Sequence, residues 1–171
     1  MNFAMVKESK VFTVLMWPAS GSYIVVLEEM PGVRLLLIWI GRSEAEAIAL
    51  KLQKAEVPRP LTHDLLKSVI QQIGCNVDRI VINELRNDTY FAKIILRNNQ
   101  QEVIEIDSRP SDAIALAIRC DSPIYIEEDV LEKGATVNKP ISQEEINHFK
   151  EKIKDLKPED FFSTGGEKEL L

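Results

Sequence analysis

The alternation of apolar and polar positions in the first third of the chain predicts a meander of three strands. Runs rich in β-branched and aromatic residues cover 11–16, 23–27 and 34–40, and turn-forming residues separate them. The third run is apolar on both faces, which is typical of a central strand covered on both sides of a sheet. The chain therefore opens with sheet structure.

Two helices are expected to follow this meander. Over 43–55 apolar residues recur at helical spacing, and Ser43 with Glu46 matches a capping box. Over 62–73 the pattern is again helical, with Thr62 as the expected N-cap. The apolar face of this second helix, which we expect to be buried, consists of Leu65, Leu66, Val69, Ile70 and Ile73.

The second half of the chain repeats the order of strands followed by a helix. Strands are expected at 78–85, 89–96, 102–106 and 123–126. A helix is expected at 110–119, because Pro110 suits a first helical position. Residues 40–50 align with 106–116, and in both an apolar strand runs directly into an alanine-rich helix. This is either a weak internal repeat or the convergence of two similar junctions.

Together these elements predict one compact α+β domain over residues 1–135. We expect a mixed, mostly antiparallel sheet with three packed helices. Residues 136–171 are expected to form an appendage, with a helix whose apolar stripe lies at 146, 149, 153 and 156 and then a polar tail. Such a helix docks either on the core or on another subunit, so we expect a homo-oligomer, most simply a homodimer.

Charge and hydropathy narrow the classes of function. The net charge of the 171 residues is −6, which speaks against non-specific nucleic-acid binding through bulk positive charge. A local basic site remains compatible with this balance. The longest apolar run, 35–40, is far shorter than the ~20 residues of a membrane helix. We therefore expect no membrane association and, because the N-terminus shows no signal-peptide pattern, a cytoplasmic location.

Two segments contain most of the candidate functional residues: RPLTHD at 59–64 and DSRPSD at 107–112. Each places Arg-Pro at an expected helix start, followed by a hydroxyl and an aspartate. The N–H groups of a helix start attract anions, and an arginine fork binds phosphate bidentately. The candidate phosphate ligands are Arg59, Thr62, Arg109 and Ser111. In the alternative interpretation these residues only cap helices and pair with neighbouring carboxylates.

A histidine lies within the first of these segments. His63 is a candidate general acid or base, because histidine as a residue type exchanges protons near neutral pH, although such a residue can also be a simple capping or exposed residue. Carboxylates in the same segments are candidate ligands for a divalent metal, Mg²⁺ or Mn²⁺. They are Asp64, Asp107 and Asp112, with Glu44 and Glu84 as further candidates.

The same residues resemble the bifunctional nuclease family. The matching stretches are GRSEAEAIALKL at 41–52, RPLTHDLL at 59–66, TYFA at 89–92 and DSRPSDAIAL at 107–116. The resemblance extends over about residues 5–132. It implies a compact α+β domain, and because plant members have been assigned both DNase and RNase activity, it implies nucleic acid as a substrate.

Two functional hypotheses follow. The first is a metal-assisted nuclease that hydrolyses phosphodiester bonds of DNA and RNA, with His63, Asp64 and Asp107 as catalytic residues and a metal held by Asp107 and Asp112. The second is a non-catalytic oligomeric binding or regulatory module, in which the same residues surround a small-anion pocket. The acidic net charge favours the second hypothesis, and the resemblance favours the first.

Overall fold

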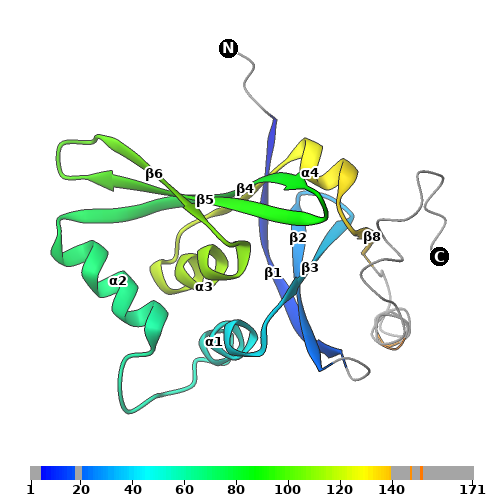
Figure 1. Cartoon of the computed structure of the whole chain (residues 1–171), viewed down its shortest axis with the longest axis horizontal. Coiled ribbons are helices and arrows are strands. Elements are labelled where there is room, and N and C mark those ends of the chain that lie inside the picture. Colours follow the sequence, from blue (N-terminus) through cyan, green and yellow to red (C-terminus); the bar gives the residue numbers. More distant parts are fainter. Residues whose placement is uncertain (1–4, 18–20, 140–146, 148–150, 152–171) are drawn as a thin grey trace.

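The computed structural model describes residues 5–17, 21–139, 147 and 151. One sheet runs through the molecule, with helices packed against it (Figure 1). The strands are β1 (Val6–Trp17), β2 (Ser22–Met30), β3 (Arg34–Ile40), β4 (Cys75–Arg86), β5 (Thr89–Asn98), β6 (Val103–Ser108), β7 (Ile124–Glu127) and β8 (Thr136–Asn138). The helices are α1 (Arg42–Leu52), α2 (Thr62–Gln72), α3 (Pro110–Cys120) and α4 (Glu128–Lys133). The predicted α+β class is confirmed.

The sheet consists of two antiparallel meanders joined in the middle. Its strand order is β6-β5-β4-β7-β1-β2-β3-β8. The joining strand β7 is parallel to β4 and antiparallel to β1, which makes the sheet mixed. In the β4–β5 hairpin, Asn87 and Asp88 both have positive φ, a conformation that these residue types tolerate better than most.

Each meander leads into a helix, so the fold contains two units of the same form. The first is β1-β2-β3-α1 and the second is β4-β5-β6-α3. In both units the third strand ends at the residue before a helix N-cap, at Ile40 and Ser108. This arrangement agrees with the internal repeat of 40–50 and 106–116.

Helices α1, α2 and α3 lie together on one face of the sheet (Figure 1). α1 packs against α3, and both helices bury small side chains, namely Ala45, Ala47, Ala113 and Ala117. Alanine allows helix backbones to approach closely, as the sequence pattern predicted. The main hydrophobic core fills the space between these helices and the sheet.

Strand β3 is covered on both faces. Leu36 and Ile38 belong to the main core, whereas Leu35 and Leu37 belong to a second cluster on the other face of the sheet. The prediction of a covered strand is therefore confirmed, but β3 is not central, because only the short strand β8 lies beyond it. The sheet thus extends to Asn138, past the expected boundary at 135, and α4 and β8 were not predicted.

The expected capping box of α1 is wrong. The N-cap is Gly41, without a side-chain cap, and Ser43 lies inside the first turn. The carboxylate of Glu46 accepts a hydrogen bond from Arg42 Nε at 2.8 Å instead. A neighbouring guanidinium one turn away thus competes successfully for the carboxylate that the capping box requires.

The start of α2 also differs from the expectation. Its N-cap is Leu61, and Thr62 is the first helical residue. The backbone N–H of Leu61 donates to Asp64 Oδ2 at 2.9 Å, so this aspartate satisfies the helix start. By contrast, Pro110 stands at the first helical position of α3, as predicted.

The apolar face of α2 is mostly exposed, contrary to the expectation. Only Ile70 of that face is buried. Leu65, Val69 and Ile73 expose 59%, 47% and 68% of their surface. The reason is that α2 turns its other flank to the core, where Lys67 donates a hydrogen bond to the backbone of Arg119 in α3.

The apolar stripe expected at 146, 149, 153 and 156 lies outside the described residues, so its docking and the oligomeric state stay predictions. Within the residues that the structure describes, no helix is both long enough and apolar enough to cross a membrane.

Candidate active site

The first turns of α2 and α3 meet, although 49 residues separate the two side chains in contact. His63, in the first turn of α2, points its Nε2 at Asp112 Oδ1 in the first turn of α3, at a distance of 3.0 Å. The imidazole is almost fully buried, while Asp112 is partly exposed. The structure therefore brings the two predicted segments together in one contact.

Asp112 is held as a carboxylate. Burial raises its pKa, but hydrogen bonds from Arg109 and His63 outweigh this effect, so the pKa of Asp112 lies below its usual range. An ionised carboxylate only accepts hydrogen bonds, so His63 Nε2 carries the proton and donates it. In the neutral imidazole, Nδ1 is then the acceptor nitrogen.

Arg109, the N-cap residue of α3, connects Asp112 to α1. Its Nε donates to Asp112 Oδ2 at 2.7 Å, and its second terminal nitrogen lies 3.0 Å from Glu44 Oε1. These contacts, with Asp112 the stronger, raise the pKa of Arg109 above its usual value. The side chain is nevertheless 66% exposed, so part of the guanidinium faces solvent.

A hollow of about 550 Å³ opens over this network; we call it the His63 hollow. It lies between the starts of α1, α2 and α3, and Thr62 is one of its exposed lining residues. Its lining comprises Ser43, Glu44, Glu46, Ala47, Leu50, Pro60, Leu61, Thr62, His63, Arg109 and Asp112.

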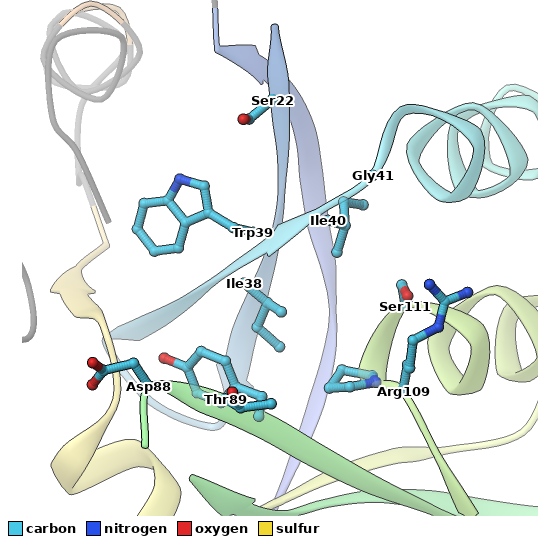
Figure 2. A pocket seen from close by; sticks show the side chains of 11 residues that line it. Ser22, Ile38, Trp39, Ile40, Gly41, Asp88, Thr89, Arg109 and Ser111 are labelled. Atoms are coloured by element: carbon cyan, nitrogen blue, oxygen red, sulfur yellow. The ribbon is translucent and has the colours of Figure 1, made fainter. Parts of the chain in front are cut away.

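Arg109 also borders a second hollow of about 400 Å³, the Ser111 hollow. Figure 2 shows the Arg109 guanidinium and the Ser111 side chain on one side of it, at the start of α3, with Ile38 and Thr89 opposite them. Ser111 itself is buried. One arginine is therefore accessible from two adjacent depressions.

A third depression, of about 360 Å³, continues from the other side of the His63 hollow; we call it the Arg59 hollow. The two share Leu50, Pro60 and Leu61 in their linings. Arg59 is exposed and has no ion-pair partner in the described part of the chain, and Lys51 lies in the same lining. The three hollows are thus adjacent: the Ser111 and His63 hollows share Arg109, and the His63 and Arg59 hollows meet between the end of α1 and the start of α2.

Asp64 belongs to a structural clamp rather than to the His63 contact. Its Oδ1 accepts a hydrogen bond from Arg119 Nε at 2.7 Å. The remaining Arg119 nitrogens donate to the carbonyl oxygens of Ala115 and Ala47, at 2.9 and 3.0 Å. Arg119 is only 3% exposed and ties α1, α2 and α3 together beneath the site.

Arg119 was missed at the sequence level. Helical spacing held a usable signal, because position 119 follows Ala115 by four residues and so lies on the same buried face of α3. Glu44 was considered only as a possible metal ligand, whereas in the structure it binds Arg109.

Asp107 lies away from the other site residues. It stands on β6 opposite Lys93, whose neighbours Ala92 and Ile94 point into the core, so Asp107 is on the sheet face opposite the helices. It is exposed there. Asp107 and Asp112 therefore do not form one ligand set, and in the described residues no three His, Cys, Asp or Glu side chains are grouped to hold a metal ion.

Both segments that meet at the site lie in the part of the chain that matches a known protein family. The model of the bifunctional nuclease domain matches residues 25–139. The chain belongs to the bifunctional nuclease domain family. The matched span contains α1, α2 and α3 and thus every residue of the His63 hollow.

Relatives within the bifunctional nuclease domain family fall into two groups. An uncharacterized protein of Mycobacterium tuberculosis is 39% identical over 150 residues, covering 82% of this chain and 89% of its own length. Bifunctional nuclease 1 of Oryza sativa subsp. japonica is 29% identical over 71% of this chain and 38% of its own length. Bifunctional nuclease 1 of Arabidopsis thaliana is 29% identical over 60% of this chain and 32% of its own length.

Proposed function

We propose that this protein is a nuclease that hydrolyses phosphodiester bonds of DNA and RNA in the His63 hollow. The observation that carries the proposal is the 3.0 Å contact between His63 and Asp112, which joins the two segments of the family resemblance in one hollow beside Arg109. The names of the plant relatives support the reaction class.

His63 is the proposed general base. With Nε2–H directed to the Asp112 carboxylate, Nδ1 can accept a proton from the attacking water. The water oxygen bonds to phosphorus as the P–O bond to the leaving oxygen breaks, and the imidazolium returns its proton to that oxygen. Asp112 acts as a positioning residue that holds the ring and stabilises the imidazolium.

Arg109 is the proposed phosphate ligand. A guanidinium has five N–H donors, and the contacts to Asp112 and Glu44 use only two of them. The remaining donors are available to phosphate oxygens, where they would stabilise the charge that develops during hydrolysis. The backbone N–H groups at the start of α3 favour an anion at the same place.

The three adjacent hollows suggest an extended substrate. Arg109 separates the Ser111 hollow from the His63 hollow, and the Arg59 hollow adds Lys51 and Arg59 further along. Successive phosphates of one flexible strand could contact these separate cations. We therefore propose single-stranded nucleic acid as the substrate form, in spite of the acidic net charge of the chain.

A metal-assisted version of this reaction does not fit the residues that we expected to hold the ion. Asp107 is on the other face of the sheet, and both oxygens of Asp112 accept hydrogen bonds from His63 and Arg109. The steps above therefore use only side chains of the chain itself.

A second candidate function is a non-catalytic module that binds a small anion. The pairing of the helix-start arginines favours it: Arg42 binds Glu46, and Arg109 binds Asp112 and Glu44. Arginines neutralised in this way can hold a loop in place without chemistry. In this alternative the protein binds oligonucleotides or phosphate but does not cleave them.

The two candidates are distinguished by the His63→Ala and His63→Gln variants, tested on labelled single-stranded DNA and RNA oligonucleotides. A general base contributes about 10²–10⁴-fold, so both variants should lose at least about 100-fold in kcat/KM. The His63→Gln variant keeps an amide donor for Asp112, and melting curves report whether the fold survives. Added imidazole should partly restore the His63→Ala variant, which a contaminating nuclease would not imitate.

The Arg109→Lys variant tests whether phosphate binding requires the planar guanidinium or only a positive charge. Lysine keeps the charge but loses the planar fork, so oligonucleotide affinity should fall about tenfold. If the His63 variants cleave like the wild type, the nuclease proposal is wrong. If the wild type does not cleave and Arg109→Lys still weakens binding, the binding module is the correct function.

A further inference from the structure

The broad apolar face of α2 has no partner in the described part of the chain. Leu65, Val69 and Ile73 recur every four residues and form one exposed stripe. A helix of 11 residues gains most of its stability by burying an apolar face, yet α2 buries only His63 and Ile70. The sequence thus encodes an apolar face that the described part of the chain leaves exposed.

Strand β6 continues this surface. Ile104 and Ile106 stand opposite the core residues Leu96 and Ile94 of β5, so they lie on the face of the sheet that carries the helices. Both are exposed, at 42% and 41%, because α3 covers β4 and β5 but not β6. In Figure 1 α2 and β6 flank the same end of the molecule.

We give these two sets of exposed side chains one name, the α2–β6 face: Leu65, Val69, Ile73, Ile104 and Ile106. The stripe on α2 is turned away from α3, since Asp64 and Lys67 on the opposite flank bind Arg119. The end of α2 also approaches the β5–β6 turn, where a Cβ placed on Gly74 would lie 3.0 Å from Asn99 Nδ2.

We propose that the α2–β6 face is the interface of a homodimer, in which α2 of each copy packs on β6 of the other. A two-fold axis repeats such a contact twice and leaves no unpaired apolar face. This inference is independent of the proposed nuclease activity.

The size of the surface fits a second copy. The exposed fractions of the five side chains correspond to on the order of 450 Å² of apolar surface. A standard interface buries about 800 Å² per partner, of which about 55–65% is apolar, so it needs roughly the same amount. The α2–β6 face can therefore supply the apolar centre of one dimer interface.

The charge of the surface also identifies the occupant. The remaining positions on this flank of α2 are Ser68 and Gln72, and Ser108 follows Ile106 on the same side of β6, so the centre of the face carries no charge, whereas Glu102, which binds Asn98, lies at its edge. Two chains with net charge −6 repel each other less through an uncharged face than elsewhere. A nucleic acid would instead require Lys or Arg there.

Sedimentation velocity of the full chain over roughly 1–100 μM tests the proposal. The wild type should have twice the 19.4 kDa chain mass. Val69→Glu and Ile104→Glu should each weaken dimerisation at least about 100-fold, because a charge would be buried in the interface. Val33→Glu, at an exposed position in the β2–β3 turn, is the matched control and should stay dimeric.

Circular dichroism melting of each variant shows whether monomers are folded. Should a Glu variant fail to fold, Val69→Ser and Ile104→Ser replace it, since they keep the surface uncharged and still remove apolar contact. A wild type that has the mass of one chain throughout the range overturns the proposal. So does a folded α2–β6 variant that dimerises like the Val33→Glu control.

Discussion

The two strand–strand–strand–helix units of this fold begin their helices in similar ways, yet only the second unit carries a candidate active site. In the first unit, Arg42 pairs with Glu46 on the surface, with 75% of the arginine side chain exposed. In the second, Arg109 pairs with Asp112, which also contacts the buried His63. The same kind of arginine–carboxylate pair is a surface contact in one unit and part of a network in the other.

The difference comes from α2, which lies between the two units in sequence and packs against α3. It contributes His63 to the start of α3 and Asp64 to the Arg119 clamp. The start of α1 has no equivalent histidine contact among the described residues. An inserted helix can thus convert one of two similar helix starts into a polar network with a hollow above it.

The two units also differ in how their sheets are covered. The first unit is packed on both faces, with separate apolar clusters around Leu36 and Leu37. The second leaves Ile104 and Ile106 of β6 exposed on its helix-bearing face. The more completely packed unit therefore lacks the histidine contact, and the less completely packed unit has both the network and the α2–β6 face.

The largest effect that separates the units should come from removing the Arg119 clamp. Arg119→Leu leaves Asp64 without its ion pair and removes the side-chain donor from the carbonyl oxygens of Ala115 and Ala47. The variant loses three hydrogen bonds that join α1, α2 and α3, so the free energy of unfolding in urea should fall by roughly 2–4 kcal/mol. Circular dichroism provides the measurement.

Arg42→Leu is the control for this prediction, because it removes an arginine whose ion pair is fully exposed. Exposed pairs of this kind contribute little, so no measurable loss of stability is expected. Equal losses in the two variants would show that α2 is not held to α3 by the clamp.

The next prediction concerns catalysis rather than stability, and its expected effect in free energy is smaller: the Asp112→Asn variant should cleave more slowly. Asparagine keeps the shape but not the charge that stabilises the imidazolium, so kcat/KM should fall on the order of 10²-fold with little change in KM. The pH–rate profile should change as well, which a purely structural role would not produce. Asp129→Asn, which alters an exposed first-turn aspartate of α4 paired with Lys133, should leave the activity unchanged.

Much of the fold could be predicted from the sequence, because the spacing of apolar residues and the positions of turn-forming residues are local signals. The strands at 34–40 and 89–96, the helix at 110–119 and the role of Pro110 all follow from neighbouring residues. The Ser43–Glu46 capping box failed because Arg42, one turn away, binds the same carboxylate. Local competition between two plausible partners was not visible in the pattern alone.

The site was only partly predictable because its contacts join distant segments. The two Arg-Pro segments stood out in the sequence as separate helix starts, and the structure brings His63 of one into contact with Asp112 of the other. The position of Asp107 could not be inferred in the same way, because the strand pleat decides on which face it lies. Nor did the apolar pattern of α2 reveal that Leu65, Val69 and Ile73 stay exposed within one chain.

The smallest effect should be the part of the acid dependence of stability that comes from Asp64 and Asp112. Burial raises the pKa of Asp64, but the Leu61 N–H and Arg119 outweigh it, so its folded-state pKa is lowered, as is that of Asp112. The unfolded chain then binds more protons, so these groups stabilise the fold above about pH 4, and this stabilisation is lost as the pH falls through the lower folded values.

Urea unfolding of the wild type and Asp64→Asn between neutral pH and about pH 3 measures this dependence. Because Asp64 is about one-third exposed, solvent screening should keep its pH-dependent part under about 1 kcal/mol. Asp64→Asn should therefore flatten the acid limb slightly, whereas Asp129→Asn on α4 should leave its slope unchanged. If Asp64→Asn also gave the wild-type slope, the Asp64 carboxylate would not contribute to the acid dependence, and its pair with Arg119 would act independently of pH in this range.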